Sequence, residues 1–349
     1  MDKRIIVNAT ALVRSGTLSI LRQFVEHIPS DSRKWLIFVS PQISLDTENK
    51  NVRIEPIEGV RAMHRRLWWD AIGVRKWLKV NDIEPVAVIS LQNNGFNVGK
   101  NVPSFIYYHQ PLPFFRIYWN PLKVRERRLW LYKNVYPFII KYFLKKDSVV
   151  FVQLDIIKKD FSKRFKYPER LIKVYCPSVS IPKESIVPQA CASSNLKLLY
   201  PAMPHSYKNH SIIDEALKLS DADVEILFTI DPEKRLTTDE RIRFMGLQPY
   251  ERICALYHEC DALLFPSYIE TFGLPLLEAA MAGMPIIASD LPYAREVLEG
   301  YEGVKFVKFN DPQAWKNAIE SIEKGKRYRP IDISKRPGWK DLFDNIKWE

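Results

Sequence analysis

Short apolar runs alternate along the chain with longer segments whose apolar positions recur at helical spacing. In the first half the runs predict buried strands at 5–10, 35–40, 86–91, 104–109, 149–153 and 172–176. Helices are predicted between most of them, near 17–28, 62–80, 123–145 and 155–165. Most runs are apolar throughout instead of alternating, which is typical of parallel strands covered on both faces.

The second half repeats this alternation of strands and helices. Strands are predicted at 197–202, 224–230, 242–245, 262–266, 285–289 and 304–309. Helices are predicted near 209–219, 249–258, 275–283, 292–298 and 311–324. The pattern predicts the α/β class with two Rossmann-like, doubly wound domains facing a cleft, with ligands at the carboxyl ends of the strands.

A stretch rich in proline and serine separates the two series. We expect residues 1–178 to form an N-terminal domain, 179–195 a linker and 196–334 a C-terminal domain. The segment 335–349 is typical of one more helix. The sequence leaves open whether that helix packs on the second domain or returns to the first.

Composition narrows the class of protein. The 349 residues are 46% hydrophobic and 27% charged, as in globular chains, which excludes a disordered or fibrous protein. The four cysteines have no metal-ligand spacing, which favours a reducing compartment. Neither a signal peptide nor about 18 uninterrupted apolar residues is apparent. We therefore expect a cytoplasmic protein.

Charge is unevenly distributed between the halves. Residues 1–190 hold 32 Lys/Arg and 16 Asp/Glu, whereas residues 191–349 hold 20 and 25. Segments 64–79 and 119–146 also place tryptophan and tyrosine among the cations, a combination that favours an anionic membrane surface. The alternative is that these aromatic side chains pack into the core of the first domain. We expect no nucleic acid partner, because no reader motif is apparent.

Several common catalytic motifs are missing. The chain has neither a G-x-G-x-x-G nor a Walker A loop, which weakens a dehydrogenase or a P-loop ATPase. It also lacks H-E-x-x-H and G-x-S-x-G, which weakens a zinc hydrolase or a serine esterase.

The most informative segment is 265–285. A predicted strand is followed by a polar loop to Gly273, and Pro275 suits the first turn of a helix. The free amides and the positive dipole end of that helix favour a phosphate. Glu270 before the helix and Glu278 inside it flank this anion site with groups that accept hydrogen bonds from hydroxyls. A diphosphate with hydroxyls on both sides, as in a sugar nucleotide, fits this arrangement.

This segment resembles the Glu-x7-Glu region of retaining, family-4 glycosyltransferases with the GT-B fold, of the bacterial polysaccharide and O-antigen type. Four other segments are similar to motifs of that family: 199–210, Phe244-Met-Gly246-Leu, Val13-Arg-Ser-Gly16-Thr and Ile106-Tyr-Tyr-His109-Gln-Pro. One position departs from the family, which usually has an arginine where this chain has Met203. Arg14 or His205 could substitute for it, or Lys208 and the helix end could suffice.

The resemblance implies that residues 1–178 form the acceptor-side domain and residues 196–334 the donor-binding domain. It also implies roles for individual residues. Glu270 would hold hydroxyls of the donor sugar and Glu278 those of the ribose, while Lys208 and Gly16 would cradle the diphosphate. His109 would line the sugar pocket from the opposite domain. The catalytic set would then be Glu270, His109 and Lys208, and the donor-binding set Gly16, Gly246, Ser267, Thr271, Phe272, Gly273, Leu274 and Glu278.

Each of these assignments has a simpler alternative. Glu278 could only complement a helix dipole, and His109 could be a satisfied core histidine among aromatic residues. Gly16 could be a turn glycine and Lys208 a solvated surface lysine. The surrounding motif favours the functional role for the two glutamates, and the place of Lys208 after a predicted strand favours phosphate contact. Both interpretations of Gly16 stay open.

The expected activity is retaining transfer of a hexose or deoxyhexose from a UDP- or GDP-linked sugar to a lipid-linked glycan in surface polysaccharide assembly. No cofactor or metal is expected. The protein would be cytoplasmic and peripherally associated with the inner face of the cell membrane. Alternatives are a sugar-nucleotide epimerase or hydrolase on the same scaffold, and a non-catalytic, membrane-adjacent scaffold of a polysaccharide assembly complex.

Overall fold

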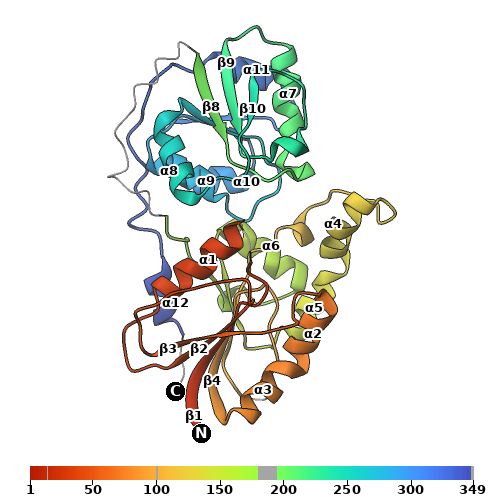
Figure 1. The fold of residues 1–349 in the computed structure, drawn as a ribbon, viewed down its shortest axis with the longest axis vertical. Helices are drawn as coiled ribbons and strands as arrows, with labels where there is room; N and C mark the ends of the chain where they lie inside the picture. The colour runs from red at the N-terminus through yellow and green to blue at the C-terminus, as the bar shows by residue number, and fades with distance from the viewer. Residues whose placement is uncertain (14, 100, 180–194, 347–349) are drawn as a thin grey trace. The chain divides into compact units, whose positions relative to one another are not determined.

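A computed structural model describes residues 1–13, 15–99, 101–179 and 195–346. The chain forms two compact units, one of residues 1–178 with 336–349 and one of residues 179–335 (Figure 1). Most of the predicted linker, 180–194, lies outside the described residues.

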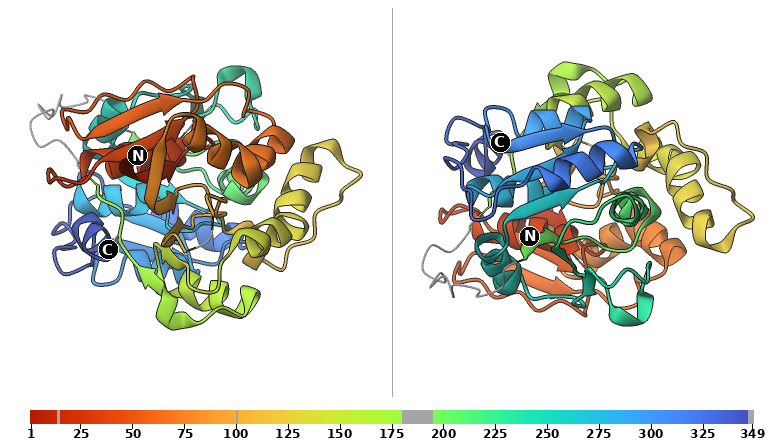
Figure 2. Two further views of the ribbon diagram at one scale, coloured as in Figure 1. Left: turned by 90° about the horizontal axis from the view of Figure 1, so that it is seen from below. Right: turned by 90° about the horizontal axis from the view of Figure 1, so that it is seen from above.

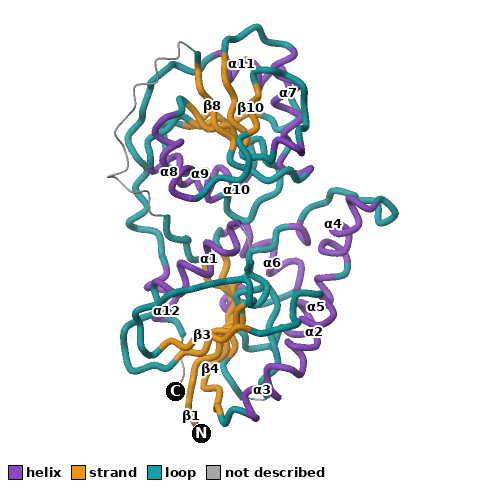
Figure 3. The backbone as a smooth tube through the Cα atoms, viewed as in Figure 1, coloured by secondary structure: helices purple, strands orange, loops and turns teal. Residues whose placement is uncertain are grey.

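The first unit is built on a seven-stranded parallel sheet of order β3-β2-β1-β4-β5-β6-β7 (Figure 3). Its strands are β1 (Asp2–Asn8), β2 (Trp35–Val39), β3 (Val52–Pro56), β4 (Ile83–Ser90), β5 (Ser104–Tyr107), β6 (Val149–Val152) and β7 (Ile172–Val174). Its helices are α1 (Ser15–Glu26), α2 (Met63–Trp68), α3 (Val74–Val80), α4 (Val124–Asn134), α5 (Tyr136–Phe143), α6 (Asp155–Phe165) and α12 (Trp339–Asp344). Strand β3 is not among the strands that the sequence predicted.

Both faces of the first sheet are covered, as alternating strand residues require. Ile5 and Val7 of β1 lie in a cluster with α1 and α12, whereas Ile6 lies in a second cluster with α3. Trp339 of α12 packs edge to face on Phe24 of α1, with ring centroids 6.0 Å apart. The C-terminal helix is therefore part of the first unit.

Two helices of the first unit differ from their predicted form. The helix expected over 62–80 contains a π-helical turn, Trp69–Gly73, between α2 and α3. The helix expected over 123–145 is divided at Val135 into α4 and α5, and Pro137 occupies the first turn of α5, where its missing N–H costs nothing. Helix α4 and its adjoining loop extend away from the sheet (Figures 1 and 2).

The second unit has a six-stranded parallel sheet of order β10-β9-β8-β11-β12-β13. Its strands are β8 (Leu196–Tyr200), β9 (Val224–Phe228), β10 (Ile242–Phe244), β11 (Ala262–Phe265), β12 (Ile286–Ser289) and β13 (Val304–Val307). Its helices are α7 (His210–Lys218), α8 (Tyr250–Glu259), α9 (Leu274–Met281), α10 (Pro292–Val297) and α11 (Pro312–Glu320). Helices α7 and α11 contact each other, as do α8 with α9 and α9 with α10. The α/β class with two doubly wound parallel sheets is confirmed.

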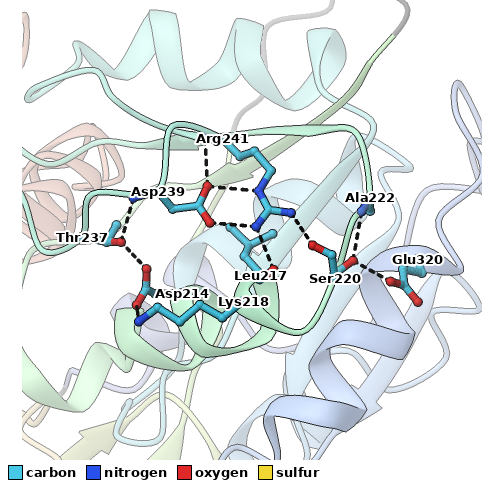
Figure 4. Close-up of polar contacts among 9 residues, drawn as sticks. All are labelled: Asp214, Leu217, Lys218, Ser220, Ala222, Thr237, Asp239, Arg241 and Glu320. Atoms are coloured by element: carbon cyan, nitrogen blue, oxygen red, sulfur yellow. Dashed lines mark hydrogen bonds and ion pairs between the residues drawn. The ribbon is translucent and has the colours of Figure 1, made fainter.

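A polar network fixes the end of α7 in the second unit (Figure 4). The Arg241 guanidinium donates to the carbonyl oxygens of Leu217 at 2.7 Å and Ser220 at 2.6 Å. It also pairs with Asp239 at 2.8 Å. The Leu217 carbonyl also accepts from the Ser220 amide at 2.9 Å, so Arg241 adds a charged donor to the backbone bonds that close this helix end.

Candidate functional site

The loop after β11 leads directly into α9. Gly273 lies just before the helix with a φ of 86°, in the left-handed region that glycine adopts without strain. A Cβ there would stand 3.3 Å from Leu276 and 3.4 Å from the Phe265 ring. Pro275 follows in the first turn, and that turn has no acidic residue. The N-terminal amides of this eight-residue helix therefore present a positive end at the carboxyl edge of β11.

An ion pair joins two neighbouring loops at this edge. The Lys208 ammonium donates to the Glu270 carboxylate, and their side chains are only 17% and 14% exposed. Lys208 belongs to a 3₁₀ turn after β8. Its backbone carbonyl oxygen accepts a hydrogen bond from the Tyr200 hydroxyl at 2.5 Å. The Tyr268 amide donates to the Tyr207 carbonyl at 3.0 Å. The backbone thus holds the two charged groups together from segments 62 residues apart.

Glu278 is buried against helix α8. Its carboxylate accepts from the Tyr257 hydroxyl at 2.6 Å. Burial raises the pKa of Glu278, whereas hydrogen bonds from Tyr257 and Tyr250 oppose that rise. The sequence prediction missed both tyrosines. Their spacing of seven residues places them on one face of a helix, which is the signal that could have found them.

The remaining predicted residues of this segment occupy different environments. Ser267 is fully buried. Its hydroxyl donates to the carbonyl oxygens of Tyr207 at 3.3 Å and Ile269 at 3.4 Å. Phe272 is buried, while Thr271 and Leu274 are partly exposed. Ser267 therefore holds the loop, and the other three lie beside the start of α9.

Gly246 follows strand β10 with a φ of 74°. Its amide donates to the Ile230 carbonyl at 2.9 Å, which ties the ends of β9 and β10 together.

Met203, where the resembling family has an arginine, is 39% exposed in the loop after β8. His205, in the same loop, stacks on Tyr207 with centroids 5.2 Å apart. Arg14, the other candidate for the missing arginine, lies outside the described residues.

In the first unit, His109 lies just past the end of β5. Its Nε2 is 3.0 Å from the Leu91 carbonyl oxygen, so this nitrogen carries the proton and donates. Loss of solvation by burial lowers the pKa of His109 to about 4, so the ring is neutral near pH 7 and Nδ1 is an acceptor. The His109 amide donates to Asn93 Oδ1 at 2.6 Å. Gly16 is exposed in the first turn of α1, after β1.

The structure thus brings some of the predicted residues together within each unit. Lys208, Glu270, Gly273 and Glu278 all lie at the carboxyl edge of the second sheet. His109 and Gly16 lie at the carboxyl edge of the first sheet. Within the described ranges, no group of three or more His, Cys, Asp or Glu side chains is placed to hold a metal ion.

Comparison with known proteins gives this geometry a context. Residues 231–335 match the family model "Glycosyl transferases group 1". The O-antigen chain mannosyltransferase RfbU of Salmonella typhimurium is 25% identical over 257 residues, which cover 68% of this chain and 69% of RfbU. The D-inositol 3-phosphate glycosyltransferase of Corynebacterium efficiens is 38% identical over 90 residues, and the match spans only 20% of its length.

Solved structures share the fold of the whole chain. WaaG, described as a glycosyltransferase involved in lipopolysaccharide biosynthesis, aligns with a TM-score of 0.66 at 13% identity, covering 91% of this chain and 90% of WaaG. HepE from Anabaena, solved in complex with UDP and glucose, aligns with a TM-score of 0.62 at 16% identity, covering 92% and 89%. These likenesses establish the fold.

Proposed function

We propose that this chain, which has the GT-B fold, is a group 1 glycosyltransferase that transfers a hexose or deoxyhexose from a UDP- or GDP-linked sugar with retention of configuration. The acceptor is a hydroxyl of a lipid-linked glycan in surface polysaccharide assembly. RfbU, which acts on O-antigen chains by its name, supports this acceptor class. The reaction is assigned to the inner face of the cell membrane.

One observation carries the proposal. Lys208, Glu270 and the start of α9 all lie at the carboxyl edge of the second sheet, where the lysine pairs with the carboxylate and the helix begins with its positive dipole end. The ammonium and the amides suit a diphosphate, and the Glu270 carboxylate suits sugar hydroxyls. Glu278, held by Tyr257, would accept from ribose hydroxyls one turn further along the helix.

The chemistry follows from where charge develops. The bond from the anomeric carbon to the diphosphate oxygen breaks through an oxocarbenium-like state, and the acceptor oxygen bonds to the same face. The acceptor proton passes to the departing phosphate oxygen, so no protein base is required. Lys208 and the α9 amides stabilise the negative charge that grows on the diphosphate, which lowers the barrier without a metal ion. His109, neutral at pH 7, would accept a hydrogen bond from the sugar at Nδ1.

Substitutions at the two glutamates test this site. We expect Glu270→Gln and Glu278→Gln each to reduce transfer at least hundredfold while the fold stays intact. Glu302→Gln, at an exposed glutamate of the same unit, serves as the matched control and should leave transfer unchanged. Full activity in both site variants would refute the assignment.

A panel of sugar nucleotides in a thermal-shift assay would identify the donor. A ligand that binds only the folded state adds about 2.7 kcal/mol to the free energy of unfolding at a hundredfold excess over Kd, and the thermal midpoint rises as a result. We expect a UDP- or GDP-sugar to do so in the wild type. Failure of every sugar nucleotide would contradict a transferase and favour a scaffold role.

We propose the α4 region as the membrane-facing surface of the first unit. Helix α4 has no buried residue, and Arg125, Arg127 and Arg128 are exposed on it. Exposed apolar side chains surround these cations in the chain: Tyr118, Leu122, Val124, Phe138 and Tyr142. Apolar side chains can enter the headgroup region while each arginine near anionic lipid adds about 1 kcal/mol. Every helix of the described residues is too short or too polar to cross a bilayer.

Vesicle flotation tests this surface. Replacing Arg125, Arg127 and Arg128 with Gln should weaken binding to phosphatidylglycerol vesicles by roughly a hundredfold, since three contributions of about 1 kcal/mol are lost. The control replaces three exposed cations of α6 with Gln, namely Lys159, Lys163 and Arg164. Equal binding by the α4 variant and the wild type would contradict the proposal.

A further inference from the structure

A buried carboxylate lies beneath the carboxyl edge of the first sheet. Asp70 is fully buried in the π-helical turn between α2 and α3. Its Oδ1 accepts from the side-chain amides of Asn8 at 2.8 Å and Gln92 at 2.9 Å. Its Oδ2 accepts from the Asn94 amide at 3.0 Å. Three neutral donors from two different strand ends thus converge on one charge.

The partners of Asp70 hold the loop after β1. Asn8 is the last residue of β1, and its Oδ1 accepts from the Thr10 hydroxyl at 3.0 Å. Gln92 Oε1 accepts from the Ala11 amide at 3.1 Å. That loop leads to the start of α1. Through Asn8 and Gln92, Asp70 therefore holds the first part of the loop after β1, at Thr10 and Ala11.

The same partners hold the loop after β4, which carries His109. Gln92 and Asn94 flank Asn93, whose side chain accepts from the His109 amide at 2.6 Å. The residue before Gln92 is Leu91, whose carbonyl accepts from the His109 ring. The Tyr136 hydroxyl lies 2.7 Å from Asn94 Oδ1 and 3.0 Å from the Gln92 carbonyl oxygen, and it closes the network from α5. Both contacts that orient His109 thus come from a loop fastened to Asp70.

This arrangement is costly for a role in folding alone. Loss of solvation by burial raises the pKa of Asp70 to about 6, and the three amide hydrogen bonds and the charge of Arg66 oppose that rise only in part. The π-helical turn that presents Asp70 is a further irregularity, and such turns are frequent at functional sites. A Cβ at Gly73 of this turn would stand 2.6 Å from the Trp69 ring, so the turn depends on glycine.

We propose that Asp70 is a positioning residue of the transferase, which acts through the 91–94 loop to fix the orientation of His109. The inference rests on the proposed function, because His109 is assigned to the sugar there. Asp70 itself touches no substrate. Its charge accepts three amide donors at once, and an asparagine would turn an N–H toward at least one of them.

A double-mutant cycle separates this role from a merely structural one. We expect Asp70→Asn to lower kcat at least tenfold, while the Kd for UDP or GDP, whichever the donor panel selects, changes less than threefold. In a His109→Ala background, the same Asp70→Asn change should alter kcat less than twofold, because its effect passes through His109. Asp261→Asn is the matched control: Asp261 is also buried, accepts from the Lys197 and Gly325 amides at 2.8 Å each, and precedes β11 in the second unit. It should leave kcat within twofold of the wild type.

A second variant covers the case in which Asp70→Asn fails to fold. Asn93→Gly removes the acceptor of the His109 amide and suits the Asn93 φ of 75°. It should lower kcat in the wild type and have little further effect in His109→Ala. Additive losses in either cycle, or an unchanged kcat in Asp70→Asn, would overturn the proposal. Absence of transfer by the wild type would instead refute the proposed function.

Discussion

Replacing Lys208 with methionine removes the one ammonium group shown beside Glu270 in the described structure. Lys208 pairs with Glu270 and lies 5.7 Å from the centroid of the Phe265 ring. Methionine keeps a similar length and apolar stem but supplies no donor. Two losses follow: the departing diphosphate has no cation at this corner, and the Glu270 carboxylate has no partner.

The size of each loss can be worked out from the geometry. Removal of one donor to a developing oxyanion costs about 2.7–4 kcal/mol, or a factor of about 10²–10³ in kcat. Breaking a fully buried ion pair costs about 3–5 kcal/mol, whereas an exposed pair contributes about 0–1 kcal/mol. The side chains of Lys208 and Glu270 are 17% and 14% exposed, so solvent screens the pair partly. We expect Lys208→Met to lower the free energy of unfolding by about 1–3 kcal/mol.

Initial rates at saturating donor, paired with thermal unfolding, check both numbers. Lys218→Met is the control, because Lys218 also pairs with a carboxylate, Asp214 at 2.6 Å, but is 68% exposed. The control should keep its kcat and lose less than about 1 kcal/mol of stability. A Lys208→Met enzyme that retains more than a tenth of the wild-type kcat would refute the reasoning that Lys208 stabilises the leaving group.

Three further changes probe the supporting structure. Tyr257→Phe removes a hydroxyl that opposes the raised pKa of Glu278, so the pKa of Glu278 should rise further. Donor affinity, which needs the carboxylate, should then be lost at a higher pH than in the wild type as the pH is lowered, and calorimetry from pH 8 to pH 5 would record this. Arg241→Ala removes the charged donors to the Leu217 and Ser220 carbonyl groups and should lower stability by about 1.5–3 kcal/mol, while donor affinity, measured by the same titration, stays unchanged. Trp339→Ala should cost about 3–5 kcal/mol in denaturant unfolding, because the indole is 2% exposed in the core of the first unit; a loss below 1 kcal/mol would show that α12 contributes little.

The sequence predicted the buried strands well, since unbroken apolar runs have few other interpretations. Strand β3 escaped because it is a half-exposed edge strand: Arg53 and Glu55 alternate with its apolar residues. The π-helical turn at Trp69–Gly73 escaped because one extra residue in a turn hardly changes helical periodicity. The division of the helix at Val135 could have been predicted, because Pro137 two residues later is typical of the first turn of a new helix.

Site residues differ in how far local pattern can reveal them. Glu270 and Gly273 stand in one continuous motif with the start of a helix, so spacing alone places them at a strand's carboxyl edge. The motif could not indicate that Lys208, 62 residues earlier, would contact Glu270, because that contact depends on the adjacency of β8 and β11 in the sheet. The family resemblance assigned both residues to the donor, but it did not predict the contact between them.

The buried polar residues that position the site residues could not be predicted from the sequence, for a different reason. Asp70 in a basic, aromatic stretch is typical of a solvated charge on a helix, yet it is fully buried. Its three amide partners come from the ends of β1 and β4, strands that are neighbours only because the chain order reverses beside β1. The same topological feature creates the edge at which His109 and Gly16 lie. A search for positioning residues in such a fold should therefore begin with buried polar side chains beneath the switch point, because strand order predicts where they gather even when no motif marks them.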